Sequence, residues 1–281
     1  MINPVLSIIL PAHDEAAYIG ACLEALLRTQ SDGFAPHLIV VANACNDDTA
    51  HIAQSFAERY TQAGWGFEVI DTPTPGKLNA LNLGDAGSDA DLRAYLDADV
   101  IVSPQLMGQI VTALNSDVPR YASGSPVVAP ATSTITGAFA RIWQRLPFVT
   151  TDTPGFGLFA VNAAGRARWG DFPVDIVSDD TFVRLSFAPS ERIRVPATYS
   201  WPMVEGLRNL VRVRRRQDAG VAEIAERFPD LMKNDQTPGL GASGTVRLAL
   251  SDPIGFGVYG LVKLLVKTPY AKTTQHWARG R

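Results

Sequence analysis

Two pairs of aspartates are the residues of this sequence best suited to chemistry. Asp97 and Asp99 flank Ala98 directly after an apolar run, and Asp179 and Asp180 are adjacent. Two carboxylates one residue apart at a strand end can face one divalent cation, which would neutralise a diphosphate and polarise its leaving oxygen. Aspartates are also common in loops, and Asp179 could simply cap a helix. The residues alone leave both interpretations open.

The elements that position the first pair alternate along the first hundred residues. The pattern predicts strands at residues 5–10, 38–41, 67–70 and 92–96, and helices at residues 15–28, 47–60 and 76–83. This βαβαβαβ order predicts an α/β fold with a mostly parallel, Rossmann-like central sheet flanked by helices. In the second half, strands are expected at 123–128, 157–161 and 193–196, and helices at 134–146, from Asp179, and at 207–228.

Polar residues follow each of the first four strands, in the loops 11–15, 43–48, 72–77 and 97–99. In open α/β sheets the ligand crevice lies beyond the carboxyl ends of the strands. The sequence therefore predicts one ligand site at this sheet edge.

Composition excludes several classes of protein. Hydrophobic residues make up 46% of the 281 residues and charged residues 19%, which is typical of a globular protein. A net charge of -3 gives no general attraction for nucleic acid. Cys22 and Cys45 lack metal-ligand spacing and suit a reducing compartment. The start of the chain has no basic signal-peptide region, and no run of about 18 apolar residues could span a bilayer. We expect a cytoplasmic protein.

The order of four motifs resembles that of family 2 glycosyltransferases. The motifs are residues 11–15, 43–49, 76–82 and 96–99, and the resemblance covers roughly residues 5–220. It implies the GT-A fold of nucleotide-diphospho-sugar transferases. It also implies inverting transfer of a sugar from a UDP- or GDP-linked donor to a hydroxyl acceptor, in polysaccharide, exopolysaccharide, cell-envelope glycan or glycolipid biosynthesis.

The resemblance also implies roles for residues of the first half. The donor nucleotide would be bound by Pro11, His13, Glu15, Asn43, Lys77, Asp97, Ala98 and Asp99. Asn43 stands where an acidic group usually recognises the base, and its amide oxygen could still accept a base N–H. Ala42 replaces another commonly acidic position, which leaves the nucleotide open. Asp99 would ligate Mg²⁺ or Mn²⁺, and Asp97 would face the ribose or the metal.

The second half carries the implied catalytic and acceptor residues. Asp180 matches the general base of the family and Asp179 its acidic neighbour, while Arg216 would bind the diphosphate. Arg216 lies in a degenerate Gln-x-x-Arg-Trp motif, a departure that favours single additions over processive synthesis. Gly155, Gly157 and Trp169 are assigned to the acceptor side, although a core or packing aromatic is the safer interpretation of Trp169.

The resemblance and composition together suggest a domain division. Residues 1–232 would form the catalytic domain, with a nucleotide-sugar half at about 1–102 and an acceptor half at about 103–232. Residues 233–281 would form a linker and a C-terminal apolar and basic helical extension. Its segment 253–281 either contacts the inner face of the cytoplasmic membrane, near a glycan or lipid-linked acceptor, or packs on the domain.

Two other functions stay open from the sequence. A haloacid-dehalogenase-like phosphatase could use Asp97 and Asp99 after the same kind of strand, although this leaves the first ninety residues unexplained. A catalytically degenerate nucleotide-sugar-binding protein would explain Ala42, Asn43 and the altered arginine-rich motif.

Overall fold

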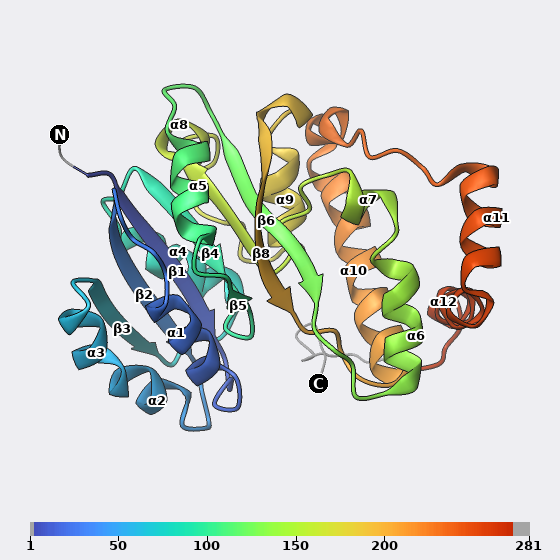
Figure 1. Cartoon of the computed structure of the whole chain (residues 1–281), viewed down its shortest axis with the longest axis horizontal. Coiled ribbons are helices and arrows are strands. Elements are labelled where there is room, and N and C mark those ends of the chain that lie inside the picture. Colours follow the sequence, from blue (N-terminus) through green and yellow to red (C-terminus); the bar gives the residue numbers. More distant parts are fainter. Residues whose placement is uncertain (1–2, 272–281) are drawn as a thin grey trace. The chain divides into compact units, whose positions relative to one another are not determined.

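The computed structural model describes residues 3–271, which form two compact units (Figure 1). The first unit comprises the chain up to Val127 together with Gly155–Asp175 and Ser186–Trp201. The second comprises Val128–Pro154, Ile176–Leu185 and the chain from Pro202 onward.

The first unit is built on one eight-stranded sheet. Its strands are β1 (Val5–Ala12), β2 (Ala35–Asn43), β3 (Gly66–Thr72), β4 (Leu92–Leu96), β5 (Ile101–Val102), β6 (Tyr121–Val128), β7 (Leu158–Asn162) and β8 (Arg192–Trp201). They lie in the order β3-β2-β1-β4-β7-β6-β8-β5. The first four strands pair in parallel, whereas β7 is antiparallel to β4 and β6, and β5 is antiparallel to β8. The predicted α/β fold is confirmed, and its parallel part is the part that carries the four polar loops.

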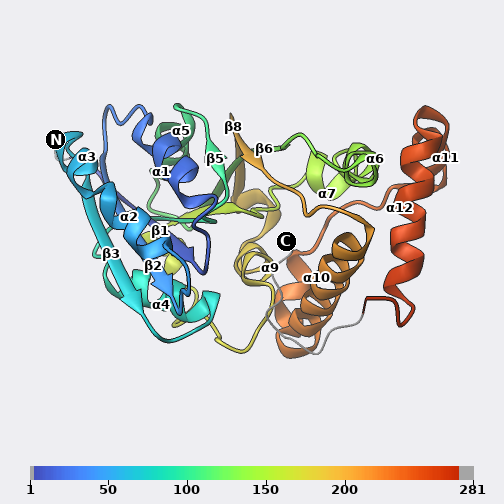
Figure 2. The same ribbon diagram turned by 90° about the horizontal axis from the view of Figure 1, so that it is seen from below.

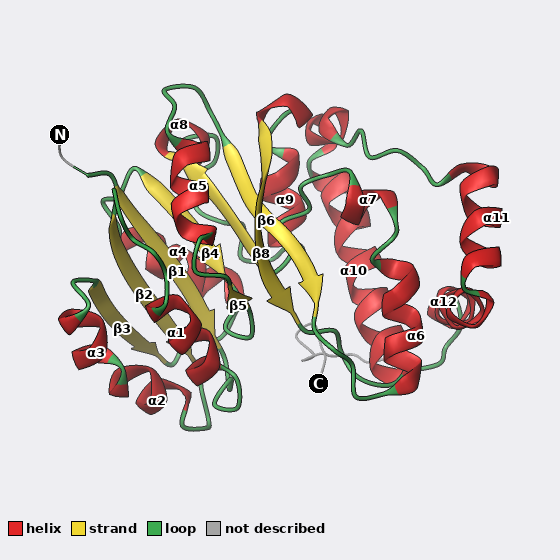
Figure 3. Ribbon diagram, viewed as in Figure 1, coloured by secondary structure: helices red, strands yellow, loops and turns green. Residues whose placement is uncertain are grey.

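Helices cover both faces of the sheet (Figures 2 and 3). The helical elements of this unit are α1 (Ile19–Leu27), α2 (Thr49–Ser55), α3 (Ala57–Gln62), α4 (Lys77–Ala86), α5 (Leu106–Leu114), α8 (Ala163–Arg166) and the 3₁₀ turn η1 (Pro189–Glu191). Ile8 of β1 lies in the core with α1 and α5, whereas Ile39 and Val41 of β2 contact Ala80 of α4. Because both faces of β1 and β2 are buried, their sequences are mostly apolar.

The helix predicted at residues 47–60 is two helices, separated at Phe56. Ser55 donates a hydrogen bond to the carbonyl of Ile52 (2.6 Å), and such back-bonding favours a break. The pattern also did not predict β5 or α5.

The second unit is almost entirely helical. It contains α6 (Thr134–Trp143), α7 (Pro147–Thr150), α9 (Asp179–Leu185), α10 (Leu207–Arg227), η2 (Pro229–Asn234), α11 (Gly241–Ser251) and α12 (Pro253–Val266). α12 packs on α6, α10 and α11. α11 begins within the segment predicted as a linker. Among the described residues, no helix combines the length and apolar character needed to cross a bilayer.

Candidate functional site

The loops that follow β1 and β2 are tied together by side chains of predicted site residues. His13 donates from Nδ1 to the carbonyl of Asn43 (2.7 Å), and Asn43 donates from Nδ2 to the carbonyl of Ala12 (2.9 Å). The backbone N–H of Glu15 donates to the hydroxyl of Thr49 (2.7 Å). The first two polar loops therefore form one connected structure at the sheet edge.

Asn43 presents a buried acceptor at this edge. The side chain is 2% exposed, and its Oδ1 has no hydrogen-bond partner among the described residues. Because Nδ2 donates to the carbonyl of Ala12, the orientation of the amide is fixed. Its Oδ1 can then accept a hydrogen bond from another group. A buried acceptor without a partner is costly, so this atom is suited to accept an N–H from a ligand.

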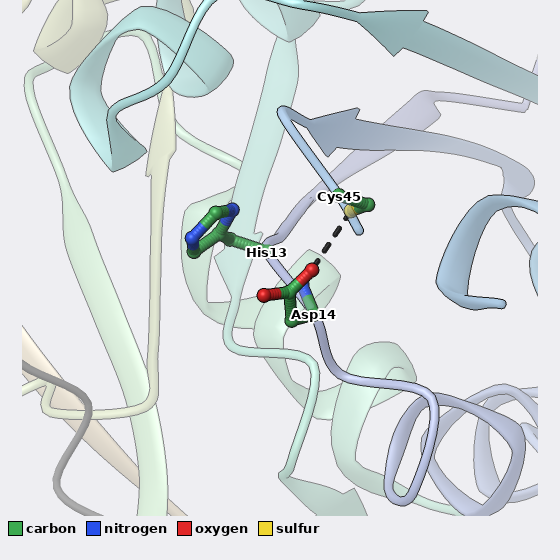
Figure 4. A group of neighbouring side chains, drawn as sticks. All are labelled: His13, Asp14 and Cys45. Atoms are coloured by element: carbon green, nitrogen blue, oxygen red, sulfur yellow. Dashed lines mark hydrogen bonds between the residues drawn. The ribbon is translucent and has the colours of Figure 1, made fainter. Parts of the chain in front are cut away.

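A cluster of His13, Asp14 and Cys45 lies in the same two loops (Figure 4), with potential ligand atoms within 4.8 Å of one another. These side chains already brace the loops. The Cys45 thiol donates to the carbonyl of Ala12 (3.5 Å), and Asp14 accepts from the N–H of Asn46 (2.5 Å). Burial raises the pKa of Cys45, which keeps the thiol protonated as a donor. The sequence pattern gave Cys45 no such role.

Lys77 and Asp97 are brought together by the third and fourth loops. Lys77 is the first residue of α4, and its Nζ lies 2.8 Å from Oδ1 of Asp97. The N–H of Asp97 donates to the carbonyl of Gly157 (2.9 Å), which fixes the turn after β4. Two residues twenty positions apart in the sequence thus form one ion pair at the predicted site.

The two aspartates after β4 create a negative potential. Burial raises the pKa of Cys22, and the charges of Asp99 and Asp97 raise it further. Both carboxylates therefore act on the same buried thiol, which lies on α1. Asp97 and Asp99 each offer carboxylate oxygens, and hard oxygen ligands of this kind suit Mg²⁺ or Mn²⁺.

Gly155 and Gly157 shape the turn that leads into β7. Both have positive φ, +74° and +76°, which favours glycine. A Cβ on Gly155 would lie 1.8 Å from the Tyr121 hydroxyl oxygen, and one on Gly157 would lie 2.8 Å from Cδ1 of Trp201. The structure thus gives both glycines a backbone role, and their assignment to the acceptor side stays a prediction. Trp201, which the sequence did not single out, lies against this turn.

We expect Gly155→Ala to lower the free energy of unfolding by about 2–4 kcal/mol, because the methyl group adds a clash to an unfavourable φ. Gly170→Ala is the matched control, since nothing lies within 4 Å of a Cβ there. Urea denaturation measures both variants. Equal stability of the two variants would contradict the packing described for Gly155.

Trp169 is buried at 9% exposure. Its ring contacts Phe172 and Phe187, and the Arg166 guanidinium lies 4.9 Å from its centroid. Arg166 in turn pairs with the buried Asp85 (2.9 Å). These contacts give Trp169 a packing role, and its predicted acceptor role is untested.

The second aspartate pair begins α9 in the second unit. Asp179 is buried, whereas Asp180 is half-buried and accepts from the N–H of Thr181 (2.7 Å). The start of α9 is fixed by α10, because Glu223 of α10 accepts a hydrogen bond from the N–H of Val177 (3.0 Å). A Cβ on Gly220 would lie 2.6 Å from the Ser178 hydroxyl, so only glycine allows this close approach. Of the pair, Asp180 is the more accessible carboxylate.

The arginine cluster of α10 has several roles. Arg215 donates to the carbonyls of Leu265 and Val266 (both 3.1 Å), and Arg214 pairs with Asp218. Arg216 is half-buried on the same helix, and its predicted diphosphate role is untested.

Comparison with known proteins adds independent information. The model of the family described as "Glycosyl transferase family 2" matches residues 7–169, more than half of the chain. A probable glycosyltransferase of Bacillus subtilis, YdaM, is 30% identical over 118 residues. That match covers 41% of this chain but only 27% of the relative, so the aligned segment spans about a quarter of that protein.

Two solved structures have a similar fold. The mannosyltransferase PcManGT from Pyrobaculum calidifontis, in complex with GDP-Man and Mn²⁺, aligns with a TM-score of 0.59 at 19% identity, covering 93% of this chain and 74% of that one. Glucosyl-3-phosphoglycerate synthase from Mycobacterium tuberculosis, with Mn²⁺, UDP and glucosyl-3-phosphoglycerate, aligns with a TM-score of 0.51 at 21% identity, covering 79% of both chains. At these identities the likeness establishes a shared GT-A fold.

Proposed function

Because this chain belongs to glycosyl transferase family 2, we propose that it transfers a sugar, with inversion, from a UDP- or GDP-linked donor to a hydroxyl acceptor. Membership of this family favours a nucleotide-sugar glycosyltransferase over a phosphatase. The observation that carries the proposal is the Lys77–Asp97 ion pair, which links two of the four polar loops at the sheet edge.

The donor nucleotide is proposed to bind along the first, second and third loops. Asn43 would accept an N–H of the base through its buried Oδ1, and uracil and guanine each offer such a group. Pro11, His13 and Glu15 would border the base and ribose. PcManGT with GDP-Man and the synthase with UDP support a choice between these two nucleotides.

The diphosphate is proposed to lie near Lys77, with Arg216 as a second cationic ligand, since lysine and guanidinium groups suit phosphate oxygens. A Mg²⁺ or Mn²⁺ ion held by Asp99 and Asp97, when bound, would neutralise the charge that develops on the leaving diphosphate. Both similar structures named above contain Mn²⁺, which supports a divalent ion here.

Asp180 is proposed as the general base. The acceptor oxygen would attack the anomeric carbon, the bond to the diphosphate would break, and the hydroxyl proton would pass to the Asp180 carboxylate. The half-buried position of Asp180 supports this choice over the buried Asp179, which we propose as its supporting neighbour. One attack from the face opposite the leaving group gives inversion.

The remaining assignments are also proposals. We assign residues 1–232 to catalysis, with Gly155, Gly157 and Trp169 on the acceptor side. The acceptor would be a glycan or a lipid-linked molecule in polysaccharide or cell-envelope assembly, at the inner face of the cytoplasmic membrane.

We expect Lys77→Gln to weaken nucleoside diphosphate binding by about tenfold, because one charge-assisted contact to phosphate is lost. Lys77→Arg should retain most of the affinity, which separates charge from packing. Isothermal titration with UDP and GDP in the presence of Mn²⁺ measures this. Unchanged affinity in Lys77→Gln would remove Lys77 from the donor site.

The stereochemical proposal is tested by proton NMR of the sugar transferred from a nucleotide donor. Inversion predicts that the first-formed product has the anomeric configuration opposite to the donor. Retention of configuration would overturn the single-displacement mechanism, and with it the role of Asp180.

A further inference from the structure

Five large aliphatic side chains are exposed on two consecutive helices of the second unit. They are Val246 and Leu250 of α11 and Ile254, Leu261 and Leu264 of α12, and each is between 45% and 77% exposed. Single exposed aliphatic residues are ordinary, but a group of this size marks an interaction surface. We call these five residues the α11–α12 surface.

The exposed residues follow helical spacing. Val246 and Leu250 are four residues apart on one side of α11, and Ile254, Leu261 and Leu264 lie along one side of α12. The other side of α12 is buried. A Cβ on Gly255 would lie 2.9 Å from the carbonyl oxygen of Ala138 on α6.

Both ends of α12 are tied to neighbouring helices. At its start, Asp252 accepts from the N–H of Gly255 (2.9 Å) and pairs with Arg141 of α6 (2.7 Å). At its end, Arg215 of α10 donates to the carbonyls of Leu265 and Val266. Rotating α12 to bury its apolar side would break these bonds. The apolar side of α12 is therefore exposed in the folded second unit.

The surface is also basic. α11 contains Arg247, α12 contains Lys263, and Lys267 follows α12, whereas the one acidic residue in 241–271 is Asp252. Asp252 is already paired with Arg141. The segment 241–271 therefore contains no other acidic side chain that could neutralise the basic side chains of α11 and α12. Pairing with a second copy of the same surface would bring like charges together, which is unfavourable. An anionic lipid surface satisfies both the charge and the apolar area.

We propose that the α11–α12 surface docks the protein on an anionic bilayer, with the aliphatic side chains in the interface and the basic side chains against phosphate headgroups. The surface includes α11, which lies outside the segment 253–281 expected to contact a membrane. Docking through this surface does not depend on any step of the proposed reaction.

Sedimentation of the full chain with phosphatidylglycerol–phosphatidylcholine vesicles tests the proposal, against vesicles of phosphatidylcholine alone. We expect binding to the anionic vesicles only, weakened by salt. Leu250→Glu combined with Ile254→Glu should abolish it, and Lys263→Gln combined with Lys267→Gln should weaken it by about tenfold. Val118→Glu, at an exposed valine of the first unit, is the matched control.

Thermal unfolding and donor binding should be unchanged in these variants, which separates loss of docking from loss of fold or of the proposed transferase site. Failure of the native protein to bind either vesicle would overturn the proposal. So would unchanged vesicle binding by the Leu250 and Ile254 variant, or a native dimer in light scattering that the same variant dissociates.

Discussion

Asp180→Asn is expected to lower the rate of sugar transfer by about 10²–10⁴-fold, because an amide cannot take the acceptor proton. Donor binding should be unchanged, since Asp180 has no proposed contact with the nucleotide. The variant should also fold normally, because an Asn side chain retains an oxygen that can accept from the N–H of Thr181. Initial rates at saturating donor, with donor affinity from titration calorimetry, measure the two effects separately.

Asp230→Asn is the control for this experiment, since Asp230 is an exposed acidic residue of the same unit. It should transfer sugar at the native rate. If Asp180→Asn also retained the native rate, Asp180 would not be the base. If it lost donor affinity in parallel with the rate, its role would be in binding.

Asp99→Asn is expected to remove most metal-dependent activity, with a fall of about a thousandfold, because a neutral amide is a weak ligand for a hard cation. The ability of Mn²⁺ to strengthen nucleoside diphosphate binding should be lost in the same variant. Rates measured over a Mn²⁺ titration, with affinities for UDP and GDP with and without the ion, test both expectations.

Asp91→Asn provides the matched control, since Asp91 is an exposed aspartate just before β4, whereas Asp99 follows that strand. It should show the native response to Mn²⁺. An unchanged Mn²⁺ response in Asp99→Asn would remove this carboxylate from the metal site.

The parallel half of the fold was predictable because its signal is local. A strand buried on both faces is mostly apolar, and parallel strands place their following loops at one edge. The proximity of Lys77 and Asp97 follows from that rule. The antiparallel direction of β7 could not be predicted in this way, because an apolar run indicates that a strand is buried but not which way it runs.

The second unit was less predictable because its important contacts join distant residues. α11 contains three glycines or serines in its first turn and resembles a linker, yet it is helical and packs on α12. Tertiary packing commonly outweighs weak helix propensity in this way. Arg215 is the neighbour of Arg216 in the sequence, yet its guanidinium binds the carbonyls at the end of α12. Charge alone does not reveal which acceptor an arginine contacts.

Within the first unit, the polar residues that were predicted have structural as well as proposed chemical roles. Asn43 and His13 tie two loops, and Asn43 still retains an acceptor for a base. The sequence could indicate the position of Asn43 but not the orientation of its amide, which depends on the carbonyl of Ala12.

The most direct test of the proposed donor and metal site is calorimetric titration of the native protein with UDP- and GDP-linked sugars, with and without Mn²⁺ or Mg²⁺. We predict that at least one of these donors binds and that the divalent ion strengthens its binding by an order of magnitude or more, about the effect of one neutralised phosphate charge. Binding of no donor, or binding that is the same with and without the ions, would contradict the account.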